Sequence, residues 1–235
     1  NVEINVEPRR LAATNAARYM ASLRGENVGA TVGYSIRYQR RVGSATRLEV
    51  VTEGLLTRRL QSDPELAGVG LVIFDEFHER SLQADLALAL CRDVQQGLRD
   101  DLRILVMSAT LDAEPLSRLL DDCPIITASG RSFPVTVEYL NSEGRVAEST
   151  AQGIRHALQA TRGDLLAFLP GRGEIDRCHD LLRDLVPDIA LLPLHGSMPF
   201  ADQEAALLPG DQRRVVLATN VAETSLTIEG IETVV

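Results

Sequence analysis

Short apolar runs alternate with stretches of helical periodicity along most of the chain. Residues 2–6 alternate apolar and polar side chains, and apolar positions then recur at helical spacing from Leu11 to Leu23, before Gly25. The same change of period predicts further strands at 33–38, 48–54, 71–74, 102–107, 124–127, 135–140, 164–169, 189–194 and 213–218. Strands that alternate with helices form parallel sheets with right-handed crossovers, so the pattern predicts an α/β fold.

Helices are predicted between many of these strands. The helix at 82–98 has apolar residues at helical spacing, which predict a buried stripe of Leu82, Leu86, Ala89, Leu90 and Val94. Other helices are predicted to begin near Thr52 and to cover 113–120, 147–161, 173–186 and 200–208.

A segment of loop composition, residues 128–134, interrupts the alternation. Strands and helices alternate again after it, so we expect two parallel-sheet domains, residues 1–130 and residues 131–235. The active edges of the two sheets could then face one another and form a cleft.

The apolar run 71–74 ends in two adjacent acids, Asp75 and Glu76, and His78 follows. Ligands of open α/β sheets bind at the carboxyl ends of the strands, where these acids would lie. One carboxylate can hold a divalent metal and the next can accept a proton from an attacking water, as in nucleotide hydrolases. The alternative interpretation is a strand that ends in solvated acids.

Small polar residues or arginines also follow other predicted strands. Arg9 and Arg10 fall at a strand-to-helix junction, where guanidinium groups and free N–H groups can face a phosphate. Arg37, Arg40, Arg41 and Arg47 cluster around a predicted hairpin or loop that contains Gly43 and Ser44. Aromatic residues beside these arginines suit contact with a nucleic-acid strand, and an exposed charged hairpin is an equal alternative. Thr52 and the amide of Gly54 could hold a phosphate, or Thr52 could cap the next helix. Further examples are Ser108, Thr110, Gly171, His195, Thr219 and Asn220.

Composition narrows the class of protein. All 24 basic residues are arginine, so no P-loop lysine is present in these residues. A net charge of −9 argues against non-specific coating of nucleic acid, although a local arginine-lined groove remains compatible with it. Cys91, Cys123 and Cys178 lie far apart, which fits reduced thiols in a cytoplasmic protein. No apolar run is long enough to span a bilayer, and no signal-peptide pattern opens the chain.

In order along the chain, these residues resemble the motifs of the DEAH-box helicases, a branch of superfamily 2. Asp75-Glu76-Phe77-His78 resembles motif II, and Ser108-Ala109-Thr110 resembles motif III. Glu7-Pro8-Arg9-Arg10 is similar to motif Ia and Thr52-Glu53-Gly54 to motif Ib. Residues 168–171 look like motif IV, and residues 194–197 and 218–228 lead through motif V. The opening Glu-Pro-Arg-Arg-Leu-Ala-Ala most resembles the bacterial HrpB-type branch.

The resemblance implies a motor of two tandem RecA-like domains, driven by ATP or another NTP with Mg²⁺, that pulls on single-stranded RNA in the 3′ to 5′ direction. Its contacts would fit DNA as well, and no membrane is involved. By position, Asp75 and Glu76 would hold the metal, Glu76 would activate water, and His78 would contact the γ-phosphate region or the second domain. Ser108 and Thr110 would link hydrolysis to strand displacement. Ser225, Thr227 and Glu229 would lie near the nucleotide, and the nucleic acid would contact Arg9, Arg10, Arg37, Thr52, Gly54, Thr219, Asn220 and Thr224.

The sequence also departs from the family pattern. Phe77 replaces the usual alanine, and Glu229 stands where relatives often have aspartate. Motif I would precede Asn1 and motif VI would follow Val235, so we expect a segment of a longer protein that is inactive by itself. Two alternatives stay open: a nucleic-acid-binding module that has lost catalysis, and a metal-dependent hydrolase with Asp75, Glu76 and His78 as ligands.

Overall fold

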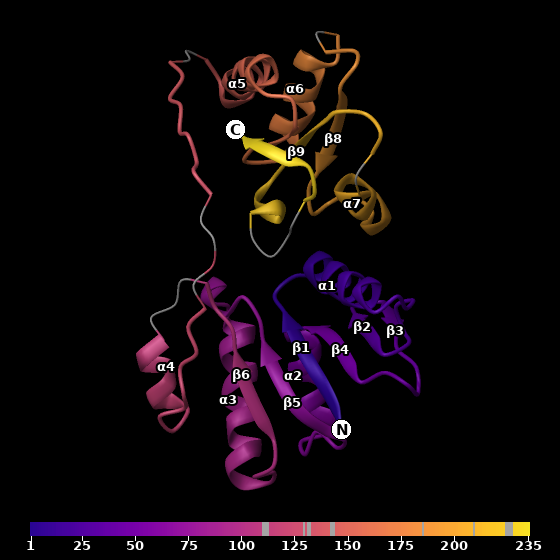
Figure 1. Cartoon of the computed structure of the whole chain (residues 1–235), viewed down its shortest axis with the longest axis vertical. Coiled ribbons are helices and arrows are strands. Elements are labelled where there is room, and N and C mark those ends of the chain that lie inside the picture. The colour runs from indigo at the N-terminus through magenta and orange to yellow at the C-terminus, as the bar shows by residue number, and fades with distance from the viewer. Residues whose placement is uncertain are drawn as a thin grey trace. The chain divides into compact units, whose positions relative to one another are not determined.

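The chain folds into two compact units, Asn1–Arg131 and Ser132–Val235 (Figure 1). The structure is a computed structural model and describes residues 1–109, 113–128, 130, 133–141, 144–184, 186–208, 210–223 and 228–235. Each unit is built on its own mostly parallel sheet, and each has its own hydrophobic core. The predicted α/β fold with two parallel sheets is confirmed.

The first unit contains a sheet in the order β3-β2-β4-β1-β5-β6, parallel except for β3. Its elements are β1 (Val2–Glu7), α1 (Arg10–Leu23), β2 (Val32–Ile36), β3 (Gln39–Arg41), β4 (Leu48–Thr52), α2 (Glu53–Ser62), β5 (Val69–Phe74), η1 (Phe77–Glu79), α3 (Leu82–Gly97), β6 (Arg103–Val106) and α4 (Ala113–Leu119). The chain was expected to turn near Gly43 and Ser44, but the antiparallel pair of β2 and β3 turns earlier, at Arg37 and Tyr38.

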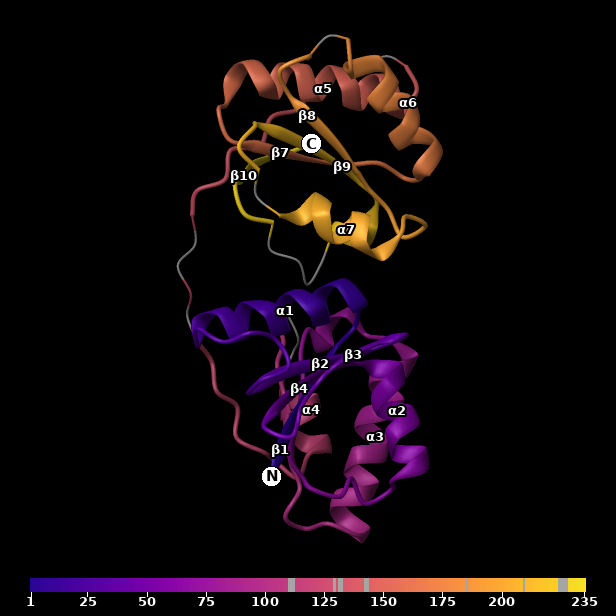
Figure 2. The same ribbon diagram turned by 90° about the vertical axis from the view of Figure 1, so that its right-hand side faces the viewer.

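Helices cover both faces of this sheet. The chain moves in one direction across the sheet from β1 through α1 to β2, and in the other from β4 through α2 to β5. Because crossovers between parallel strands are right-handed, the two directions place α1 on one face and α2 with α3 on the other (Figure 2). The core between the sheet and α2 with α3 includes Ile4, Val72 and Phe74, each at most 1% exposed.

The second unit has a parallel sheet in the order β10-β7-β9-β8. Its elements are α5 (Val146–Ala160), β7 (Asp164–Phe168), α6 (Arg172–Leu182), β8 (Ala190–Leu194), α7 (Phe200–Leu207), β9 (Arg214–Ala218), η2 (Asn220–Ala222) and β10 (Ile231–Val234). Helices α5 and α6 lie on one face and α7 on the other, as the opposite directions of the β7–β8 and β8–β9 crossovers require (Figure 2).

Two predicted strands are wrong. Residues 124–127 and 135–140 form no strand, and Ile126 and Tyr139 are 90% and 93% exposed. Both segments have the apolar, β-branched composition of a strand. A strand nevertheless needs a partner for its backbone N–H and C=O groups, and neither segment pairs with a described strand of either sheet.

The predicted buried face of α3 is also wrong in phase. Leu82 is 80% exposed and Leu86 42%, whereas Val94 alone of the larger predicted residues is fully buried. The buried residues are instead Ala84, Ala87, Leu88, Cys91 and Val94. Alanines on this face allow α3 to approach α2 closely, so packing between the helices decided which stripe was buried.

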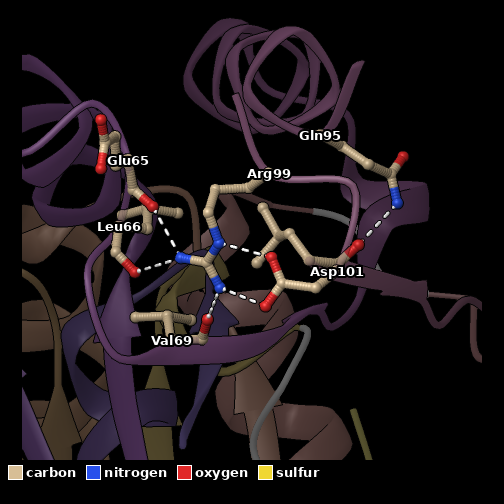
Figure 3. Close-up of polar contacts among 7 residues, drawn as sticks. Glu65, Leu66, Val69, Gln95, Arg99 and Asp101 are labelled. Atoms are coloured by element: carbon tan, nitrogen blue, oxygen red, sulfur yellow. Dashed lines mark hydrogen bonds and ion pairs between the residues drawn. The ribbon is translucent and has the colours of Figure 1, made fainter. Parts of the chain in front are cut away.

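Within each unit, an arginine holds loops together. In the first unit, the Arg99 guanidinium donates to the carbonyl oxygens of Glu65, Leu66 and Val69 and forms a bidentate pair with Asp101 (Figure 3). It thereby ties the turn before β6 to the turn before β5. In the second unit, Arg214 is 1% exposed, and its Nε lies 2.7 Å from Oδ2 of Asp164.

Arg214 also donates to the carbonyl oxygens of Leu208 and Glu229, so its guanidinium links β9 to β7 and to the turn before β10. Arg214→Met should destabilise the chain by about 3–5 kcal/mol, because Asp164 and these carbonyls lose their buried partner. The free energy of unfolding in urea, followed by circular dichroism, measures this loss. Arg162→Met, an exposed change of the same type, is the control and should stay within about 0.5 kcal/mol of wild type.

Candidate functional site

The carboxyl ends of four neighbouring strands meet at one edge of the first sheet. The register pairs Glu7 with Thr52, Val6 with Phe74, and Phe74 with Val106. Asp75 follows Phe74 directly, and Ser108 comes two residues after the end of β6. The parallel sheet therefore brings together residues that are up to a hundred positions apart in the sequence, as the pattern predicted for this edge.

The backbone after β5 is held in a sharply bent loop. The N–H of Asp75 donates to Val6 O at 3.0 Å, which continues the sheet, and Oδ1 of Asp75 accepts the N–H of Glu76 at 2.8 Å. Glu76 then adopts the left-handed conformation, with φ 48° and ψ 34°. A left-handed residue other than glycine costs free energy and persists only where its surroundings hold it, so this loop stores strain beside the two acids.

Phe77 anchors this loop. Its side chain is 4% exposed and meets the ring of Phe74 edge-on, with 6.1 Å between the ring centroids, and its N–H donates to Met107 O at 3.1 Å. The guanidinium of Arg80 lies over the other side of the ring at 5.6 Å from its centroid. The larger residue at this position therefore fits into the core, where it fixes the loop to β6.

His78 lies close to the acid pair. Its Nδ1 is 3.3 Å from Oε2 of Glu76, within ion-pair range, although this nitrogen has no hydrogen-bond partner among the described residues. Positive charge on His78 would stabilise the Glu76 carboxylate. His78 is thus placed to respond to a charge that arrives at Glu76.

Glu7 belongs to this site although the sequence argument gave it no role. Its side chain is 4% exposed, and Nδ2 of Asn5 donates to its Oε1 at 3.1 Å. Burial, and then the negative charge of Asp75, raise the pKa of Glu7 to about 8, while the bond from Asn5 opposes the shift. No distinct signal in the sequence marks it, because Glu3, Asn5 and Glu7 are the polar positions of one alternating strand and only burial separates Glu7 from exposed Glu3.

The donor set suits a hard cation. Burial, followed by the charge of Asp75, also raises the pKa of Glu76. Carboxylate oxygens are the ligands that Mg²⁺ prefers, and a divalent ion would relieve the repulsion among Asp75, Glu76 and Glu7. Among the described residues no group of three or more His, Cys, Asp or Glu side chains could hold a metal ion, so the interpretation of Asp75, Glu76 and His78 as a three-ligand metal centre has no support there.

The predicted nucleic-acid residues of the first unit lie around the same edge. Arg9 is the N-cap of α1 and Arg10 its first residue, while Arg37 lies in the β2–β3 turn with its guanidinium 4.8 Å from the Tyr38 ring centroid. Thr52 is the N-cap of α2 but its side chain makes no capping hydrogen bond, which removes the structural alternative for its hydroxyl. A Cβ on Gly54 would meet no described atom within 4 Å, so the space beside its backbone is open.

In the second unit, the corresponding residues again follow strands at one edge. The N–H of Thr219 donates to Leu194 O at 3.0 Å, and the N–H of Leu169 donates to Ala218 O at 2.8 Å. Asn220 and Glu223 line a pocket of about 590 Å³ with Phe168, Leu169 and Pro170. Glu229 lies apart from this pocket in the turn before β10, with its side chain exposed and its carbonyl oxygen bound by Arg214.

Four residues predicted to have roles lie outside the described residues: Thr110, Thr224, Ser225 and Thr227. The remaining histidines are accounted for structurally. At the surface, Nε2 of His156 lies 3.1 Å from Oε2 of Glu138. Nδ1 of His179 lies 3.9 Å from Oδ1 of Asp180, also at the surface. His195 is buried, and its Nδ1 is 2.9 Å from Oγ of Ser197.

The raised pKa of Glu7 predicts a pH-dependent stability. Between its ordinary pKa of 4.5 and about 8, the folded chain holds a proton on Glu7 that the unfolded chain releases. The free energy of unfolding should therefore fall as pH rises through this range, by up to about 1.4 kcal/mol per pH unit from this group. Glu7→Gln cannot lose a proton, so its stability should decline less between pH 5 and pH 8, as measured by urea unfolding with a chelator present.

Glu3→Gln provides the matched control, because Glu3 is on the same strand but exposed. Its stability should follow the wild-type dependence on pH. Parallel curves for Glu7→Gln and wild type would show that the Glu7 carboxyl is ionised in the folded chain.

Comparisons with known proteins agree with the motifs. Residues 149–235 match the Helicase conserved C-terminal domain family. The chain is 56% identical, over 99% of its length, to the ATP-dependent RNA helicase HrpB of Escherichia coli K12, and it covers 29% of that protein. It is 38% identical, over 97% of its length, to the probable ATP-dependent RNA helicase DHR2 of Saccharomyces cerevisiae, and it covers 33% of that protein.

The fold agrees as well. The crystal structure of the Escherichia coli DEAH/RHA helicase HrpB superimposes with a TM-score of 0.87 at 55% identity, over 99% of this chain and 30% of that one. The chain thus spans about a third of the length of these relatives. No helix in the described part of the chain is long and apolar enough to cross a membrane. By motif order, sequence identity and fold, the chain is similar, over the residues that it spans, to HrpB and related DEAH-box RNA helicases.

Proposed function

We propose that the complete protein couples Mg²⁺-dependent NTP hydrolysis to translocation on RNA and to its unwinding. The observation that carries this proposal is the convergence of Asp75 and Glu76 with Thr52 and Ser108 at one sheet edge, flanked by Arg9. At this edge, the acids proposed for hydrolysis and the groups proposed to bind a phosphate backbone lie at the ends of neighbouring strands. The names of the relatives support RNA as the substrate.

The chemistry assigns different tasks to the two acids. Asp75 and Glu76 would hold Mg²⁺, which when bound neutralises charge on the phosphates. Glu76 would accept the proton of the attacking water, and burial makes it a stronger base by raising its pKa. His78, 3.3 Å from Glu76, would orient that carboxylate. Ser108, beside this loop after β6, and Thr110 would connect hydrolysis to movement of the strand.

The two units would act as two RecA-like domains, residues 1–130 with motifs Ia to III and residues 131–235 with motifs IV and V. The nucleic-acid backbone would contact Arg9, Arg10, Arg37, Thr52, Gly54, Thr219, Asn220 and Thr224. Ser225, Thr227 and Glu229 would lie at the nucleotide. Such contacts bind the phosphate backbone rather than the bases, so single-stranded DNA is a possible second ligand. A cytoplasmic location fits the free cysteines Cys91, Cys123 and Cys178.

The alternative function is a nucleic-acid-binding RecA-like module without catalysis. It requires that the complete protein have no phosphate-binding lysine, and residues 1–235 contain none. Against it, Asp75, Glu76 and His78 are all present and are held by a strained loop, which binding alone does not need. Hydrolysis by the complete protein decides between the two.

Glu76→Gln in the complete protein should lower kcat for ATP hydrolysis by about 10²–10⁴-fold, because the water loses its base. Affinity for single-stranded RNA, measured with a non-hydrolysable ATP analogue, should remain. Glu65→Gln, an exposed acid of the same unit, is the control and should keep wild-type turnover. A wild-type protein that binds RNA but never hydrolyses ATP would establish the module without catalysis, and preference for single-stranded DNA would revise the substrate.

Residues 1–235 by themselves should show no magnesium-dependent turnover. They contain no lysine, which the phosphate-binding loop of such motors requires. An NTPase assay of this segment beside the complete protein makes the measurement. Turnover near that of the complete protein would contradict the expectation.

A further inference from the structure

The loop that carries Glu76 and His78 is attached directly to the helix that begins at Thr52. The hydroxyl of Ser81, at the end of this loop, donates to Oε2 of Glu53 at 2.5 Å. Glu53 is the first residue of α2 and stands between Thr52 and Gly54, the proposed nucleic-acid contacts. The two residues are 28 positions apart in the sequence, and neither is among the residues proposed to bind metal, nucleotide or nucleic acid.

The Ser81 hydroxyl both donates and accepts a hydrogen bond. While the hydroxyl proton goes to Glu53, the oxygen accepts the N–H of Ala84 at 2.9 Å and so caps α3. The Glu53 carboxylate is partly buried, and the bond from Ser81 opposes the rise in its pKa that burial causes. A short hydrogen bond to a partly buried carboxylate is among the stronger polar contacts in proteins.

The loop 76–80, which leads to Ser81, has a strained residue at each end. Glu76 has φ 48° and Arg80 has φ 45°, so two residues other than glycine are left-handed on either side of the turn Phe77–Glu79. Arg80 is held by a bidentate pair with Asp85, at 3.2 and 3.0 Å. Because such conformations persist only while neighbouring contacts hold them, a displacement of Ser81 would change the backbone that orients Glu76.

We propose that Glu53 and Ser81 are positioning residues whose hydrogen bond couples nucleic acid at the start of α2 to the orientation of Glu76 in the hydrolysis site. This inference rests on the proposed function. A polynucleotide that binds Thr52 and Gly54 pulls on the first turn of α2, and the Glu53–Ser81 bond transmits that displacement to the loop. Without RNA nothing displaces the start of α2, and the contacts of Phe77 and Arg80 hold the loop. The bond is therefore expected to affect how strongly RNA stimulates hydrolysis rather than the hydrolysis that occurs without RNA.

Ser81→Asp in the complete protein separates coupling from folding. Aspartate caps a helix as well as serine does, so α3 stays capped, but the donor to Glu53 is replaced by a second carboxylate. ATP turnover without RNA should stay within about twofold of wild type, and stimulation by single-stranded RNA should fall about fivefold or more. Ser81→Thr keeps both the cap and the donor, and should behave as wild type.

A reversed bond provides the decisive comparison. In the double variant E53Q/S81D the amide can donate to the new carboxylate, so RNA stimulation should return, which a merely structural defect would not allow. Glu53→Ala removes the acceptor without touching the cap, and should lose stimulation even if Ser81→Asp fails to fold. Unchanged stimulation in Glu53→Ala, or no recovery in a folded double variant, overturns the inference. A wild-type protein without any ATP turnover would instead contradict the proposed function.

Discussion

The parallel register of β1 with β4 and β5 is the constraint on which the rest of the first unit depends. It pairs Glu7 with Thr52 and Val6 with Phe74, so the chain leaves neighbouring strands at the same edge. A shift of one residue would turn buried Val6 and Phe74 toward the opposite face of the sheet, and the apolar core makes such a shift unfavourable. The core therefore fixes the position of residues that take no part in it.

Acidic side chains lie together at this edge, although burial destabilises their charged forms. Asp75, Glu76 and Glu7 lie together, and burial raises the pKa of Glu7 and Glu76. Their repulsion is reduced by a proton on Glu7 and would be reduced further by a bound cation. Arg99 and Arg214, by contrast, hold loops in place through backbone carbonyls. The clustered acids therefore destabilise the folded chain, whereas the arginine contacts stabilise its loops.

The loop from Glu76 to Ser81 connects this edge with the start of α2. Phe77 fixes it to the core, Arg9 contacts Glu79 at 3.5 Å, and Ser81 is bound to Glu53. Each contact reaches a different element, so the left-handed residues Glu76 and Arg80 are held from several directions. A loop of this kind can change state when one contact changes, which is a useful property beside a hydrolytic acid.

The sequence by itself determined the α/β class, most strands and helices, and the acid pair after residue 74, because period and strand ends are local properties of the chain. The same local signals failed at residues 124–127 and 135–140, where an apolar β-branched segment needs a partner strand that the sequence cannot name. They also failed on α3, because the stripe that is buried depends on how closely alanines let α2 approach. Only the tertiary structure decided that burial raises the pKa of Glu7 and that Ser81 meets Glu53. Those properties depend on desolvation and on contacts between residues far apart in the sequence.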